Sequence, residues 1–140
     1  MIIKRILIAT TPEISLGLFL IFSSSVGQTF FISLFSGEIR NAFNLSHGMF
    51  GILYSVATLK SAILFFWLGK LTDQFNLTVL GLITLGILSG FSFLLSIAET
   101  LHILFLSLLG LRLFGQRMIS HIAVTAMARW FSKKRGRALS

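Results

Sequence analysis

Four long apolar stretches constrain this chain more than any other feature of its sequence. A transmembrane helix needs about 20 mostly apolar residues to cross a hydrocarbon layer about 30 Å thick. The stretches that meet this requirement cover residues 14–36, 48–69, 77–98 and 101–131. Hydrophobic residues make up 55% of the chain and charged residues only 11%, too few to cover the surface of a soluble domain. We therefore predict an all-α membrane protein with four transmembrane helices.

Several classes of protein are excluded by what the sequence lacks. The chain contains no cysteine, which removes thiolate metal sites, disulfide bonds and thiol nucleophiles. It has no HExxH motif, no paired carboxylates and no nucleophile constellation, so we expect no enzyme, no metal and no cofactor. The first apolar stretch is longer than the core of a signal peptide and lacks a small-x-small cleavage site, so we expect it to be retained as a helix.

The distribution of positive charge predicts the orientation in the membrane. Cytoplasmic loops are enriched in Lys and Arg. With the N-terminus inside, Arg40 alone lies in the outer loops, whereas the inner set consists of Lys4, Arg5, Lys70, Arg129, Lys133, Lys134, Arg135 and Arg137. The net charge of +8 is therefore explained mainly by topology. We expect the basic loop at residues 129–137 to contact anionic lipid, not nucleic acid.

Lys60 lies near the middle of the second stretch. An ionisable side chain within a membrane helix costs roughly 2.5–3.5 kcal/mol on insertion scales, so such residues usually face a cavity or a partner. On a helical wheel the small residues fall on the opposite side, and they are Gly51, Ser55, Thr58, Ala62 and Gly69. We expect this small face to pack against another helix and Lys60 to face a water-filled cavity, where it would bind substrate. The alternative is a lysine that extends to the headgroups.

The fourth stretch carries a second central cation, Arg112. Gln116 follows four residues later and shares its face, so we expect both side chains to line a substrate pathway. Arg117 and His121 form another pair with the same spacing, rotated by about 140–180° from Arg112 on an α-helix. We expect that second pair to serve helix packing or hydrogen bonding between helices.

The sign of the central charges indicates the substrate. The acids Glu13, Glu38, Asp73 and Glu99 all lie at the ends of the apolar stretches or in loops, so none neutralises Lys60 or Arg112 within this chain. A partner must come from helices outside these four or from an anion bound between them. We therefore expect a small anionic substrate, with Gln28 of the first stretch as a further contact.

Two further segments resemble one known family. The sequence Gly69-Lys70-Leu71-Thr72-Asp73 is similar to the loop between helices 2 and 3 of the major facilitator superfamily. In that loop the glycine permits close packing and the aspartate caps a helix or forms an ion pair at the inner gate. The resemblance implies a gate role for Gly69, Leu71 and Asp73.

The fourth stretch carries the second match. Arg112-Leu113-Phe114-Gly115-Gln116 is similar to the fourth-helix arginine motif of the same superfamily, in which the glycine permits tight packing, and Arg117 departs from the small residue expected next. The segment from Ala128 to Ala138 resembles the loop before helix 5 in the monocarboxylate or oxalate–formate exchanger-like branch. The resemblance implies the first four of twelve helices in a bacterial inner membrane, alternating access around a central site, and coupling to a proton or a counter-transported anion.

One rival from another class stays open at this point. A complete four-helix protein could act as a small oligomeric exporter or as a non-transporting membrane subunit. Small multidrug exporters carry a membrane-embedded glutamate in the first helix, whereas Glu13 here lies at the inner edge of that helix. Whether the encoding DNA continues into eight further spans would distinguish this rival from a piece of a larger transporter.

Overall fold

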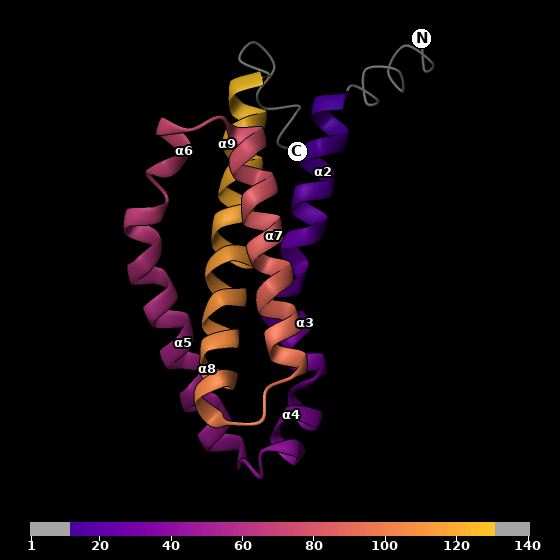
Figure 1. Cartoon of the computed structure of the whole chain (residues 1–140), viewed down its shortest axis with the longest axis vertical. Coiled ribbons are helices and arrows are strands. Elements are labelled where there is room, and N and C mark those ends of the chain that lie inside the picture. Colours follow the sequence, from indigo (N-terminus) through magenta and orange to yellow (C-terminus); the bar gives the residue numbers. More distant parts are fainter. Residues whose placement is uncertain (1–11, 131–140) are drawn as a thin grey trace.

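The computed structural model describes residues 12–130, with side chains from residue 15 to residue 129, and that part of the chain forms a helical bundle without strands (Figure 1). Three of its helices are long and apolar enough to cross a membrane, at His47–Gln74, Leu77–Ser96 and Leu101–Arg129. These correspond to the second, third and fourth stretches predicted from the sequence. The described chain is therefore of the kind found in integral membrane proteins.

The first predicted span, residues 14–36, is not one continuous helix. It divides into α2 (Pro12–Ser24), a 3-10 turn η1 (Ser25–Gly27), and two short helices, α3 (Thr29–Leu34) and α4 (Ser36–Ala42). Gln28 separates η1 from α3 with an extended backbone, at φ −82° and ψ 155°. The prediction of an unbroken span over 14–36 was therefore wrong, because the chain leaves helical geometry about halfway along it.

The break lies where two backbones meet closely. A Cβ added to Gly115 would lie 2.8 Å from Cα and 2.9 Å from N of Gly27, and one added to Gly27 would collide with the Leu111 carbonyl oxygen. Only residues without a side chain fit both positions, since a real Cβ essentially never comes so close to another heavy atom. The pair Gly27 and Gly115 therefore lets η1 approach the fourth helix at mid-length.

The fourth helix also departs from α geometry. It runs from α8 (Leu101–Gly110) through a nine-residue π-helix, η2 (Leu111–Ile119), into α9 (Ser120–Trp130). In a π-helix the hydrogen bonds join residues five apart, so residues with that spacing lie on the same face. Arg112 and Arg117 have that spacing. The prediction that the Arg117 pair faces away from Arg112 assumed α geometry and was wrong for Arg117.

The fourth helix is the central element of the bundle. Its η2 segment contacts α2, α5 (His47–Leu68), α7 (Leu77–Ser96) and η1. Figure 1 shows α9 partly behind α7 and α8 between α5 and α7, with α5 and α2 on opposite sides of the bundle. One core cluster, which includes Leu20, Leu88 and Ile122, joins α2 and α7 to η2 and α9. A second cluster of Ile32, Ala57, Leu104 and Leu108 joins α3, α5 and α8.

The starts of three helices are fixed by polar side chains that accept backbone N–H groups left without a partner inside the helix. Ser46 accepts from Met49 at 3.1 Å, Asn76 accepts from Thr78 at 2.9 Å and Thr100 accepts from Ile103 at 3.4 Å. A short helix α6 (Leu71–Gln74) links α5 to α7. We call the end of the bundle that contains α6 the α6 end, and the opposite end, which contains α4, the α4 end (Figure 1).

Candidate functional site: an arginine cluster beside a basic groove

Arg112 lies inside the bundle and bonds to neutral groups from three elements. Its exposed fraction is 5%. Its Nε donates to Thr58 Oγ1 at 3.1 Å, and its Nη1 donates to Thr29 Oγ1 at 3.0 Å and to the Gly27 carbonyl oxygen at 3.3 Å. The guanidinium also stacks on the Tyr54 ring, with 5.0 Å from Cζ to the ring centroid. We call these five residues the arginine cluster.

The break in the first span supplies part of this cluster. Leaving helical geometry at Gln28 ends the regular helix hydrogen bonding at Gly27, and the Gly27 carbonyl then accepts from Arg112. Tyr54 completes the contact between α5 and α3, because its hydroxyl donates to Thr29 Oγ1 at 3.1 Å. Non-helical backbone at membrane depth is tolerated where it is buried in protein and its polar groups are satisfied. Arg112 is one of the groups that satisfies them.

Gln28 and Gln116 lie near the cluster without bonding to Arg112 in the structure. The Gln28 side-chain amide donates to Ser24 Oγ at 3.4 Å. The Gln116 side-chain oxygen is buried without a hydrogen-bond partner among the described residues. Gln116 shares with Gly115 the segment that packs on Gly27, since a Cβ on Gly27 would lie 2.7 Å from the Gln116 backbone nitrogen. Both residues therefore belong to the crossing of η1 with η2.

A series of hollows runs along one face of α5, and we call this series the groove. The hollow toward the α4 end has a volume of about 210 Å³ and is lined by Arg40 and His47, among others. The middle hollow, of about 330 Å³, shares Tyr54 with it. The hollow toward the α6 end, of about 370 Å³, shares Ala62 with the middle one. Neighbouring hollows share one wall residue, so the three follow one another along α5.

The middle hollow has a largely apolar wall, with hydroxyl groups and one cation among its lining residues. It is lined by Tyr54, Ser55, Thr58, Leu59, Ala62 and Arg117. Arg117 Nε donates to Ser61 Oγ at 3.1 Å. The positive charge of Arg117 repels that of Arg112, whose guanidinium contacts the Thr58 hydroxyl and the Tyr54 ring. No acidic residue lines this hollow, so its wall carries an uncompensated positive charge.

The small face of α5 borders this groove. Ser55, Thr58 and Ala62 line the middle hollow, and a Cβ on Gly51 would meet no atom within 4 Å. Gly51 and Ser55 are exposed, whereas Thr58 bonds Arg112 of the fourth helix, so the prediction that this small face packs against another helix was wrong except at Thr58. The wheel placed Lys60 opposite these residues, and Lys60 is indeed not among the residues that line the groove.

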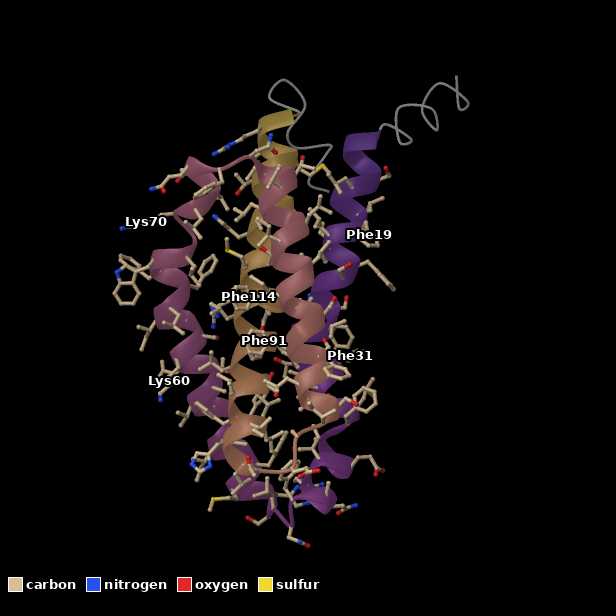
Figure 2. The ribbon with its side chains drawn as sticks, in the orientation of Figure 1. Phe19, Phe31, Lys60, Lys70, Phe91 and Phe114 are labelled. Atoms are coloured by element: carbon tan, nitrogen blue, oxygen red, sulfur yellow. The ribbon has the colours of Figure 1, made fainter. Side chains whose placement is uncertain are left out.

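Lys60 extends from the outer side of α5. Its side chain is exposed, and its Nζ lies 5.2 Å from the centroid of the Phe105 ring of α8. Figure 2 shows Lys60 pointing away from the bundle, whereas the Phe91 and Phe114 rings lie inside it, with 5.7 Å between their centroids. The structure therefore does not bring Lys60 together with Arg112.

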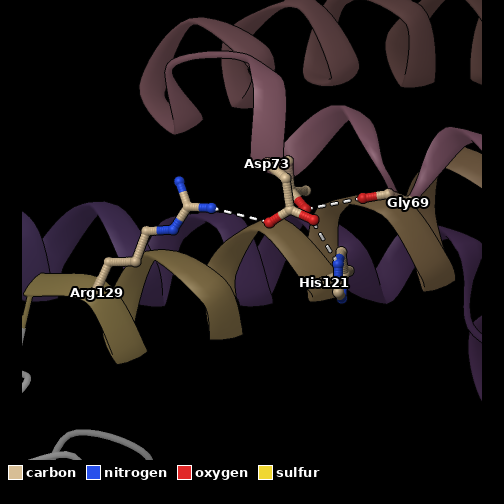
Figure 3. A network of polar contacts seen from close by, with 5 residues as sticks. Gly69, Asp73, His121 and Arg129 are labelled. Carbon is tan, nitrogen blue, oxygen red and sulfur yellow. Dashed lines mark hydrogen bonds and ion pairs between the residues drawn. The ribbon is translucent and has the colours of Figure 1, made fainter.

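The α6 end carries a separate polar network (Figure 3). Asp73 of α6 forms an ion pair with Arg129 of α9 at 3.1 Å, with both side chains well exposed. The buried Thr72 hydroxyl donates to the Gly69 carbonyl oxygen at 2.8 Å and lies 3.3 Å from His121 Nε2. This network joins the end of α5 to α9, so it links two helices at one end of the groove.

Of the three residues to which the family resemblance gives a gate role, two take part in this network. Asp73 forms the ion pair, and Gly69 supplies the carbonyl that Thr72 bonds. Leu71 packs against the core cluster of α2, α7 and η2. Arg129, placed by the sequence in a basic loop over 129–137, instead lies within α9; residues 131–137 lie outside the described part.

Sequence reasoning did not identify Thr72 and Tyr54 as site residues. Thr72 lies between Leu71 and Asp73 of the loop, and nothing in the sequence marks it. Only the structure shows that it is buried. Tyr54 is the single tyrosine of the chain, at four residues from Thr58, and this spacing on a helix was a usable signal. The contacts of Thr72 with His121 and of Tyr54 with Arg112 join residues far apart in the sequence, so local spacing cannot reveal them.

Comparisons with known proteins give no match: no family model, no curated protein and no solved structure is similar to this chain. Among the described residues no group of three or more His, Asp or Glu side chains is placed to hold a metal ion. The site is therefore defined by its own geometry, which consists of a buried guanidinium, a groove beside it and an ion pair at one end.

Proposed function

We propose that this chain is part of a secondary transporter that moves a small organic anion across a bacterial inner membrane by alternating access. In this proposal the α6 end faces the cytoplasm. The chain supplies the first four helices of a major facilitator fold, with its first helix broken at Gln28. The motifs at Gly69-Leu71-Asp73 and at Arg112-Gly115 support this assignment by their position in the chain.

One observation carries the proposal. Arg112 is buried at mid-length of the bundle and bonds only to neutral groups within the described chain, so no negative group there balances its charge. An uncompensated cation beside a groove attracts anions, because opposite charge gathers where low-dielectric walls concentrate the field. A cation substrate would be repelled at the same place.

The α6 end supplies a gate in this proposal. The Asp73–Arg129 pair joins α6 to α9, and the Thr72–His121 contact lies beside it. Breaking these contacts would let α5 and its groove-lining face move relative to α9. Asp73 would therefore affect the rate of turnover more than the affinity for the anion, and coupling to a proton or counter-anion would act on the same movement.

The test is uptake of radiolabelled small carboxylates into cells that express the gene for this chain together with any sequence that continues it in frame. We expect saturable uptake of a carboxylate, its loss in Arg112→Ala, and a lower maximal rate with an unchanged half-saturation concentration in Asp73→Asn. Immunoblots of the membrane fraction control for insertion. Wild-type uptake in Arg112→Ala would contradict the proposal.

A second arm tests the rival from the sequence. The 140-residue chain alone, reconstituted in vesicles, should carry no saturable flux if it supplies only part of a transporter. Saturable flux of an organic cation by the chain alone would instead favour a small oligomeric exporter.

A further inference from the structure

We infer that Arg117, and not Arg112 or Lys60, is the residue that binds the anion directly, with its two terminal guanidinium nitrogens turned toward a carboxylate in the middle hollow. This inference rests on the proposed function for the kind of ligand. It goes beyond it by assigning the contact to a residue that departs from the pattern of the resembling family.

The π-helix is the first step. With α geometry Arg117 would lie well away from Arg112 around the helix, but the five-residue hydrogen bonding of η2 turns both toward α5. Arg112 then bonds Thr58 and Arg117 bonds Ser61, two residues three apart on α5. The two guanidinium groups therefore lie on one side of the fourth helix.

The difference in exposure is the second step. Arg112 is buried and stacked by Tyr54, so it is shielded from the groove. Arg117 is half-buried and lines the middle hollow. A bound anion can therefore touch Arg117, whereas Arg112 contributes its charge through the wall.

The hydrogen bonds of Arg117 indicate how it binds. Its Nε donates to Ser61 Oγ, and the Ser61 hydroxyl donates to the Thr58 carbonyl oxygen at 2.7 Å. The planar fork of arginine matches a carboxylate with two parallel hydrogen bonds. With Nε engaged, the two terminal nitrogens provide that pair. Ser61 is thus a positioning residue that fixes the plane of the fork.

Thr58 adds a further donor. Thr58 Oγ1 accepts from Arg112 Nε, so the hydroxyl keeps its own proton for another acceptor. Thr58 and Ser55 both line the middle hollow with Arg117. The hollow is a shallow, open depression of about 330 Å³, in which a small organic acid would contact Arg117 and these hydroxyl groups.

Binding is tested on the 140-residue chain in lipid nanodiscs with two probes of nearly the same shape, acetate and the uncharged acetamide. Acetate carrying ¹³C is titrated and its line broadening is followed by NMR. We expect saturable binding of acetate and none of acetamide. Arg117→Met should weaken acetate binding at least tenfold, and Arg117→Lys about threefold to tenfold, because lysine keeps the charge but lacks the fork.

Lys60→Met is the matched control. It removes one positive charge from α5, as Arg117→Met does from η2, but at a position outside the groove. The affinity for acetate should therefore stay within twofold of that of the wild-type chain. Equal losses in Lys60→Met and Arg117→Met would overturn the inference, since binding would then follow net charge. Saturable binding of acetamide like that of acetate, or no binding of acetate to the wild-type chain, would overturn it as well.

Circular dichroism of each variant checks that helix content is preserved. If Arg117→Met fails to fold, Arg117→Lys and Ser61→Ala decide, and unchanged affinity in both would overturn the inference. The two proposals fail separately. Arg117-dependent binding without cellular uptake would contradict transport alone, and carboxylate uptake that survives Arg117→Met would contradict the assignment of Arg117 alone.

Discussion

Lys60 and Arg112 are both basic residues within membrane-length helices, but they differ in burial and in hydrogen bonding. Arg112 is buried and bonds to groups from η1, α3 and α5. Lys60 is exposed on α5 and its Nζ contacts one aromatic ring. The sequence alone gives both residues the same description.

The difference shows what a cation needs inside a helical bundle. Burying an unpaired charge is costly, and hydrogen bonds to oxygen atoms reduce that cost. Regular helices have few backbone oxygens to offer, because their carbonyl groups are already used. The break at Gln28 ends this regular bonding and makes the Gly27 carbonyl available to Arg112. No such break lies beside Lys60, which is inside the continuous helix α5.

The largest effect is expected at the helix crossing that creates this difference. Gly27→Ala places a methyl group against the Leu111 carbonyl oxygen, where backbone and not a flexible side chain must move. Overpacking of this kind costs typically 1–3 kcal/mol, and we expect about 3 kcal/mol here. The free energy of unfolding, measured in mixed detergent micelles, provides the check.

Gly86→Ala is the control for that experiment. A Cβ on Gly86 meets no atom within 4 Å, and Gly86 lies inside α7. Alanine is favoured over glycine within a helix by about 1 kcal/mol, so this variant should be equal or more stable. Similar destabilisation in both glycine variants would remove the crossing as the cause.

A direct test of the comparison replaces each cation by methionine. Arg112→Met leaves the Gly27 carbonyl without its donor, and we expect a loss of about 2 kcal/mol in the free energy of unfolding. Lys60→Met breaks no hydrogen bond in the described chain and should change that free energy by less than about 0.5 kcal/mol. The same unfolding titration measures both, and equal losses would mean that burial does not distinguish the two residues.

The smallest effect is expected at the α6 end. Asp73→Asn removes an exposed ion pair, and such pairs contribute about 0–1 kcal/mol. We expect a change below about 0.5 kcal/mol at physiological salt, even though the same variant slows transport in our proposal. A loss as large as that of Arg112→Met would show that this end, and not the crossing, holds the bundle together.

The sequence predicted the long regular helices well. The predicted spans 48–69 and 77–98 match α5 and α7 within one or two residues, because hydrophobic length determines them. The irregular parts were not predicted. The segment from Ser23 to Gln28 is polar enough to suggest a weak stretch of helix. Whether the helix is interrupted there depends on the close approach of Gly115, which lies 88 residues away from Gly27.

The face of Arg117 could not be predicted for a related reason. A helical wheel assumes one angle per residue, and no residue type in the segment 111–119 marks a change to π geometry. The wheel placed Lys60 correctly relative to the small residues because α5 is a regular helix, but none of the hollows described along α5 is the cavity expected beside Lys60. It was wrong for Arg117 because η2 is not an α-helix. The ion pair between Asp73 and Arg129 depends on how α6 turns back toward α9, which local spacing does not reveal.

The neutral partners of Arg112 make its place in the bundle insensitive to salt. Its guanidinium is buried and bonds to carbonyl and hydroxyl oxygens, which dissolved ions do not reach. The pair at the α6 end joins two exposed opposite charges, and dissolved ions screen their attraction. High salt therefore loosens one end of the molecule and leaves its middle unchanged.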